Sequence, residues 1–199
     1  MFNLKSLLRN CCAAAVLAGA SLGAMATPVT YHVAIDTSTL SGDGLLTLSF
    51  VQNGNAGPVV ATVTKLTGLV SGVTATGDVT ADADSLTIGN AIGDNFIDLN
   101  ATFGGEFGFD LMFSEGYLNE TASAFSSLYV FLTDTDYVNL AGDLSTGLGH
   151  FDITGGSRII TVINAPSLLT VEVPEPSELL LVLTALAAMG VTMRRRAVR

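Results

Sequence analysis

Hydrophobic residues recur at every second position through most of this 199-residue chain, and this period limits its secondary structure more than any other feature. The run Phe107, Phe109, Leu111 and Phe113 alternates with residues that are mostly small or polar. Successive side chains of a strand point to opposite faces, so the alternation is typical of strands with one buried and one solvated face. No window between Thr27 and Val173 combines a helical period with capping residues, and this part of the chain is therefore predicted to be all-β.

The same period, interrupted by Gly, Asn, Asp, Pro and Ser, predicts a series of short strands. They cover 30–36, Leu45–Val51, Val59–Leu66, Val73–Thr80, Ser85–Ile88, 96–103, 106–114, Ser126–Thr133, Gly149–Thr154, Arg158–Ile163 and Leu168–Val173. Turns are expected at Ser41–Gly44, Asn53–Asn55, Gly142-Asp143 and Gly155-Gly156, and longer loops at Gly116–Ser123 and Asp134–Gly147. Such a pattern favours an antiparallel β-sandwich, jelly-roll-like, with a closed barrel as the alternative.

Charge is distributed unevenly along the chain. Between Thr27 and Val173 there are 16 acidic residues and only two basic ones, Lys65 and Arg158, which gives this part a net charge of −14. A nucleic-acid-binding protein needs a basic face, and an anionic membrane surface would repel so acidic a domain. We therefore expect no nucleic-acid partner and a solvated, exported domain.

The N-terminus has the three parts of a secretory signal. Lys5 and Arg9 precede an apolar run, Cys11–Leu22, and small residues at Ala24 and Ala26 mark a signal-peptidase cleavage site. The run is short for an N-terminal membrane anchor, so residues 1–26 are predicted to form a cleaved signal helix. Both cysteines lie inside this segment, and the mature protein would have neither a disulfide nor a cysteine nucleophile.

The C-terminus combines a proline motif, an apolar run and a basic cluster. Val173-Pro174-Glu175-Pro176 precedes Leu179–Met193, and Arg194, Arg195 and Arg196 follow. As a helix the apolar run would be about 22 Å long, short for a hydrocarbon core of about 30 Å. The arginines should remain cytoplasmic, which places everything upstream outside the inner membrane.

This three-part tail resembles the PEP-CTERM sorting signal of Gram-negative bacteria, with Pro174, Glu175 and Pro176 matching the namesake motif. The resemblance implies recognition by an exosortase, a membrane-embedded cysteine protease-like transpeptidase that removes the helix. An ordinary tail anchor is the alternative, but it would not need an N-terminal signal. Together with the N-terminal signal and the alternating body, this tail divides the chain into a signal peptide (1–26), a β-sandwich domain (27–172) and a sorting signal (173–199) with a transmembrane helix over 179–193. The start of the domain, Tyr31–Ser38, also resembles small uncharacterised PEP-CTERM proteins, which brings no known activity.

Calcium is the most specific ligand that the acidic loops suggest, because hard cations prefer several carboxylate and carbonyl oxygens within one loop. Asp134 and Asp136 are weak candidate ligands in a glycine-containing loop with Asp143, although their spacing does not fit an EF-hand. Two other acidic clusters are present, Asp78, Asp82 and Asp84, and Asp94 with Asp98. Because turns recruit aspartate for local hydrogen bonds, we expect no cofactor, with calcium at Asp134 and Asp136 as the alternative.

Catalytic residues are not predicted. His32 and His150, the two histidines, have the acids Asp36 and Asp152 close in sequence, but no nucleophile elbow accompanies them. Carbohydrate binding remains open through Tyr117, Tyr129 and Tyr137, although a core or rim position is expected for each and the chain has no Trp.

We therefore expect a non-enzymatic surface or exopolysaccharide-matrix protein that is anchored in the inner membrane before processing and then lies at the cell surface or outside. Signal peptidase and an exosortase would process it, and extracellular polysaccharide is a possible partner. A carbohydrate-binding or adhesion module is the alternative, and an extracellular hydrolase a weaker one.

Overall fold

The computed structural model describes residues 29–53, 56–68, 70–91, 93–114, 116–117, 124–157, 160–164 and 168–173. The predicted signal peptide and the sorting segment from Pro174 onward lie outside these ranges. Within the ranges, no helix has the length and apolar character needed to cross a membrane. The strands are β1 (Thr30–Asp36), β2 (Gly42–Asn53), β3 (Val60–Thr67), β4 (Val70–Thr76), β5 (Val79–Ala81), β6 (Ser85–Gly89), β7 (Phe96–Phe103), β8 (Glu106–Phe113), β9 (Phe125–Thr133), β10 (Gly149–Thr154), β11 (Ile160–Asn164) and β12 (Leu169–Glu172).

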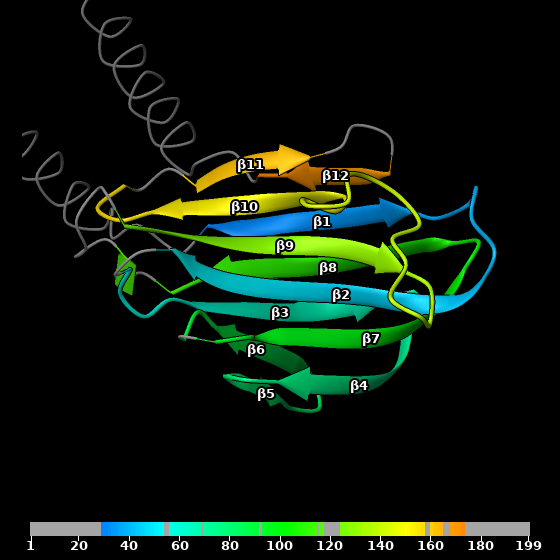
Figure 1. The fold of residues 1–199 in the computed structure, drawn as a ribbon, viewed down its shortest axis with the longest axis horizontal. Coiled ribbons are helices and arrows are strands. Elements are labelled where there is room, and N and C mark those ends of the chain that lie inside the picture. The colour runs from blue at the N-terminus through cyan, green and yellow to red at the C-terminus, as the bar shows by residue number, and fades with distance from the viewer. Residues whose placement is uncertain are drawn as a thin grey trace, which may run out of the picture. The chain divides into compact units, whose positions relative to one another are not determined.

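These strands form two six-stranded sheets, which lie one behind the other in Figure 1. Sheet A has the order β12-β1-β8-β3-β6-β5, and sheet B has the order β11-β10-β9-β2-β7-β4. Every pair of neighbouring strands is antiparallel. The predicted all-β, antiparallel, sandwich-like fold is therefore confirmed. Both sheets have open edges among the described residues, so the closed-barrel alternative is wrong.

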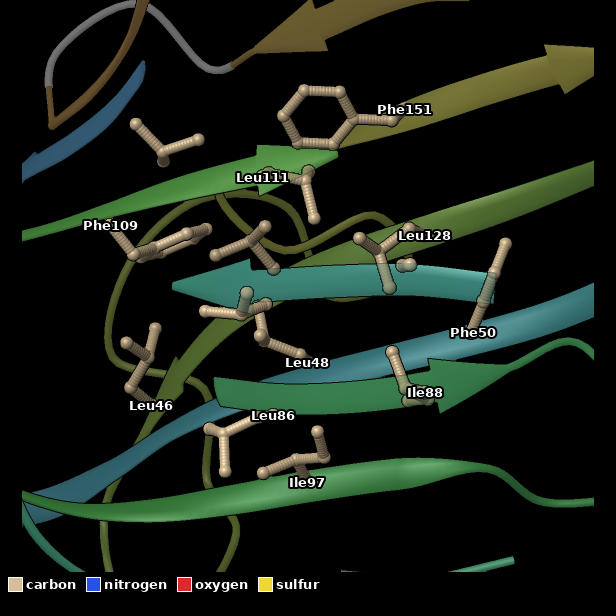
Figure 2. Packing of buried hydrophobic residues seen from close by; sticks show 14 of the residues in the cluster. Leu46, Leu48, Phe50, Leu86, Ile88, Ile97, Phe109, Leu111, Leu128 and Phe151 are labelled. Carbon is tan, nitrogen blue, oxygen red and sulfur yellow. The ribbon is translucent and has the colours of Figure 1, made fainter. Parts of the chain in front are cut away.

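The core lies between the sheets and contains the residues that the alternation placed on the buried faces. Figure 2 shows side chains of both sheets meeting there, including Leu48 and Phe50 from β2 and Leu111 from β8, none of which is exposed to solvent. Burying each such side chain contributes about 1.5–3 kcal/mol. Tyr31 packs edge-to-face against Phe151, with ring centroids 5.5 Å apart.

One predicted turn is wrong, because Gly42 to Gly44 are the first residues of strand β2. Gly44 pairs with Ala101 of β7. A Cβ at this glycine would lie 2.3 Å from the Thr133 carbonyl oxygen and 2.5 Å from the Phe103 ring. Glycine is needed here for close packing within a strand rather than for turning the chain.

The predicted strand Val73–Thr80 is also wrong, because it comprises two strands in different sheets. The chain leaves β4 in sheet B and enters β5 in sheet A through Gly77 and Asp78. Gly77 has a φ of 82°, which a residue with a side chain rarely adopts. The Asp78 amide then donates to the Asn95 side-chain oxygen at 2.9 Å and so closes this turn.

Candidate functional site

The outward face of sheet B carries a row of residues on four neighbouring strands. His150 of β10 is opposite Tyr129 of β9, Tyr129 is opposite Ser49 of β2, and Ser49 is opposite Phe96 of β7. Opposed residues of an antiparallel ladder point to the same face. A second, shorter row runs through Phe131, Thr47 and Asp98. We call this surface the ring face, formed by Phe96, Tyr129, Phe131, Tyr137 and His150.

Tyr129 contacts two other rings of the ring face, those of His150 and Phe131. The centroids of Tyr129 and His150 are 5.1 Å apart with planes inclined by 35°. Those of Tyr129 and Phe131 are 6.0 Å apart and stacked at 28°. All three side chains are half-buried, so each keeps part of its ring exposed to solvent. Packed ring pairs restrict side-chain motion, so the cluster offers a preorganised apolar platform.

Asp98 is 2% exposed although it points outward from β7. The Thr47 hydroxyl donates to its Oδ1 at 2.6 Å, and the Tyr137 hydroxyl donates to its Oδ2 at 3.1 Å. These two bonds offset part of the cost of burying a carboxylate. The bond to Asp98 raises the pKa of Tyr137, so the phenol remains a donor at neutral pH.

Tyr137 reaches Asp98 from the loop between β9 and β10, which crosses in front of sheet B in Figure 1. It has a φ of 62°, unusual for a residue with a side chain, and is 62% exposed. Asp134 holds the turn before it, since its Oδ1 accepts from the Asp136 and Val138 amides at 2.9 Å each. The loop therefore presents Tyr137 at the border of the ring face.

The hydrogen bonds of this loop affect Asp134 and Asp136, the two candidate calcium ligands. One Asp134 oxygen is already engaged by two backbone amides, which is the local role that turn aspartates commonly have. The described residues contain no group of three or more His, Cys, Asp or Glu side chains that could hold a metal ion. Calcium binding at Asp134 and Asp136 stays a prediction.

His150 lies beside Asp152, as its sequence position suggested. Its Nε2 is 3.5 Å from Asp152 Oδ2, while the Ser127 hydroxyl donates to Asp152 Oδ1 at 2.6 Å. His150 Nδ1 is buried and has no hydrogen-bond partner among the described residues. A serine nucleophile must bond to the imidazole, but Ser127 bonds to the carboxylate instead, so this trio lacks the order that activates serine.

The suggested pairing of His32 with Asp36 is wrong. His32 Nδ1 lies 2.5 Å from Asp110 Oδ1 on the neighbouring strand, and Asp36 accepts from the Ser38 amide. Residues four apart along a strand are about 13 Å apart, whereas opposed residues on paired strands are about 5 Å apart. Lys65 Nζ lies 2.7 Å from Asp110 Oδ2. The hydrogen bond from Lys65, and a weaker contribution from His32, lower the pKa of Asp110.

Lys65 has a φ of 53° and lies at a break in the register of β3 and β8. It also lines an open cavity of about 480 Å³, together with Asp82 and Asp84. These groups belong to sheet A and its β5–β6 turn, so they are separate from the ring face.

Of the three tyrosines considered from sequence, two share the ring face and one does not. Tyr129 and Tyr137 lie on it, whereas Tyr117 is buried at 8% exposure. The sequence reasoning missed Phe96, Phe131 and His150 as members of this surface. A signal was present, because Phe96 and Phe131 occupy positions of their strands where the alternation expects solvated residues.

Comparison with known proteins found no match: no protein-family model, no curated protein and no solved structure matches the chain.

Proposed function

We propose that this chain is an exported, non-enzymatic surface or exopolysaccharide-matrix protein, sorted and cleaved by an exosortase through its Pro-Glu-Pro motif. One observation supports the site of processing. Strand β12, the last one in the described part of the chain, ends at Glu172, and Val173 is 52% exposed. Cleavage near Pro176 would therefore remove none of the described strands.

Mass spectrometry of the protein recovered outside the cell tests this proposal. The expected C-terminus lies near Pro176, with no peptide from Leu179–Arg199. Replacing Pro174, Glu175 and Pro176 by alanine should leave full-length protein in the inner membrane. Normal processing of that variant, or recovery of extracellular protein that keeps Arg194–Arg196, would replace the sorting proposal with a plain tail anchor.

We also propose a jelly-roll winding for strands β1 to β8. Sheet A contains the order β1-β8-β3-β6, and sheet B contains β2-β7-β4. Early and late strands of this segment therefore alternate, as they do when a long hairpin is wound into two sheets. Strand β5 departs from this winding, because it pairs with β6 in sheet A. Strands β9 to β11 extend sheet B beside β2, and β12 extends sheet A beside β1.

For the mature domain we propose carbohydrate binding through the ring face. The observation that carries this proposal is the contiguous cluster of Tyr129, Phe131 and His150 beside the partly exposed carboxylate of Asp152. A sugar has an apolar C–H face that packs on aromatic rings and hydroxyl groups that donate to carboxylates. Ligand sites commonly combine apolar surface with a few placed polar groups in this way.

A glycan array probed with the purified full chain tests this role. The terminal segments are apolar, so the chain is kept in a polyoxyethylene detergent, which has no sugar headgroup to compete for the site. Binding to any glycan that Tyr129→Ala removes supports the proposal. Turnover of a glycan that His32→Ala or His150→Ala abolishes would instead favour the hydrolase alternative.

A further inference from the structure

We propose that the ring face takes one ligand class: an uncharged, extended glycan chain of at least three sugar units, lying across the strands. This inference rests on the proposed carbohydrate role. It specifies the charge of the glycan, its minimum length and its direction across the strands. It follows from the spacing of the rings, the charges around them and the position of Tyr137.

The row of His150, Tyr129, Ser49 and Phe96 sets the direction and the length. Its members lie on β10, β9, β2 and β7, which are consecutive neighbours in sheet B. Neighbouring strands are about 4.8 Å apart, so the row is roughly 14 Å long. This strand spacing of about 4.8 Å is close to the advance of one sugar unit in an extended chain. A chain that crosses the strands can therefore place successive sugars over successive members of the row.

The sequence of side chains within the row fits this arrangement. Tyr129 and Phe96 carry rings, while Ser49 between them carries only a hydroxyl. One sugar can stack at each ring, and the unit between them meets a small polar side chain. A single sugar would contact only one of the two rings, so affinity should rise with chain length until both are covered.

The negative charge beside the row opposes the binding of acidic glycans. Asp152 points to this face with its side chain 30% exposed, whereas Asp98 is buried and both of its oxygens accept hydrogen bonds. Lys65 is the one Lys or Arg among the described residues, and it is paired with Asp110 on the other sheet. An acidic glycan would meet the Asp152 carboxylate with no described Lys or Arg beside the row to offset its charge, whereas uncharged hydroxyl groups can donate to Asp152.

Tyr137 offers a further exposed ring on the side of the second row. Its hydroxyl donates to Asp98, which belongs to the second row, and the residue is 62% exposed. The loop that carries it is held by Asp134, so the ring is positioned before a ligand arrives. A preorganised ring loses little freedom on binding, which favours its use as a contact.

We test the inference with an array of immobilised oligosaccharides of one to six units. One half of the array carries uncharged sugars and the other half carries chains that contain uronic acid. The array is probed with the full chain in polyoxyethylene detergent. We expect binding on the uncharged half only, increasing up to at least three units. Tyr129→Ala and Phe96→Ala should each weaken binding about tenfold, as expected for loss of one stacked ring. Tyr129→Phe keeps the ring and should retain binding.

Phe125→Ala is the matched control. Phe125 is an exposed ring of the same strand as Tyr129, but it pairs with Thr154 and Asn53 at the end of the strand and lies outside the row. Near-ultraviolet circular dichroism of each variant verifies folding.

Three results would overturn the inference while leaving a carbohydrate role in place. They are binding to the acidic half, equal affinity for one and six units, or loss of binding in Phe125→Ala but not in Phe96→Ala. The absence of binding to either half would instead overturn the carbohydrate role together with this inference.

Discussion

Replacing Gly44 by alanine tests the close packing at the start of β2. The new Cβ would lie 2.3 Å from the backbone oxygen of Thr133, where ordinary contact begins near 3.4 Å. This oxygen belongs to β9, which pairs with β2 at Leu45, so it cannot move without opening the ladder. The Phe103 ring, 2.5 Å away on the other side, is itself buried. The strands must therefore separate locally.

The expected cost follows from these contacts. Overpacking a well-filled site costs about 1–3 kcal/mol and more where the neighbour is rigid, so we take the upper end. Replacing glycine also restricts the unfolded chain, which returns about 0.4–1 kcal/mol. The net loss is about 2–3 kcal/mol, or roughly 5–10 °C in melting temperature for a domain of this size.

Gly105→Ala is the matched control, because nothing lies within 4 Å of its Cβ position and its φ is outside the left-handed region. It should leave stability unchanged or raise it by up to about 1 kcal/mol. Near-ultraviolet circular dichroism of tyrosine follows unfolding selectively, since the chain has no Trp and all four tyrosines lie between Tyr31 and Tyr137. Equal melting temperatures for the two variants would refute the packing argument.

Three further outcomes are expected. Lys65, and to a lesser degree His32, hold the pKa of Asp110 in the folded state below the unfolded value of about 3.9. The ionised Asp110 therefore stabilises the fold above that pH, and this stabilisation is lost as the pH falls through the folded-state pKa. Melting temperatures of the wild type and Asp110→Asn should accordingly differ more at pH 7 than at pH 2.5, and a constant difference would contradict this. Tyr137→Phe removes the loop's bond to Asp98 and should speed hydrogen exchange of the Val138 and Leu140 amides, whereas Tyr129→Phe should not. Millimolar calcium should leave the melting temperature unchanged, and a rise that Asp134→Asn with Asp136→Asn removes would establish the calcium site instead.

The alternation of residues predicted the buried faces accurately. Phe107, Phe109, Leu111 and Phe113 are all buried, and Gly149–Thr154 is a strand with the predicted bounds. Such predictions succeed because the period of a strand is local and one face must be buried. The division between β4 and β5 could not be predicted in this way, because the residues on both sides of Gly77 keep the same composition while the chain changes sheets.

The candidate site was predictable only in part. Asp98 and Asp110 occupy positions that alternate with hydrophobic residues along their strands, and both point outward. They are nevertheless buried, because Tyr137 contacts the first and Lys65 the second. These partners are far away in sequence, and their approach depends on a loop and on a break in strand register. Contacts of this kind cannot be inferred from the period of either strand.

The two faces of strand β9 have different roles: its inward side chains stabilise the fold, and its outward side chains form part of the ring face. Its inward residues Leu128, Val130 and Leu132 have no exposed surface, and they fix the strand in sheet B. Its outward residues Tyr129 and Phe131 contribute contacts above the sheet and no packing between the layers. Because side chains alternate between the faces, a substitution at Tyr129 alters the platform while the inward residues keep their contacts. Strand β9 extends sheet B beside β2, and the ring face spans that junction from β10 to β7. Substitutions on the outward face of β9 are therefore expected to change the proposed ligand preference of the ring face without unfolding the domain.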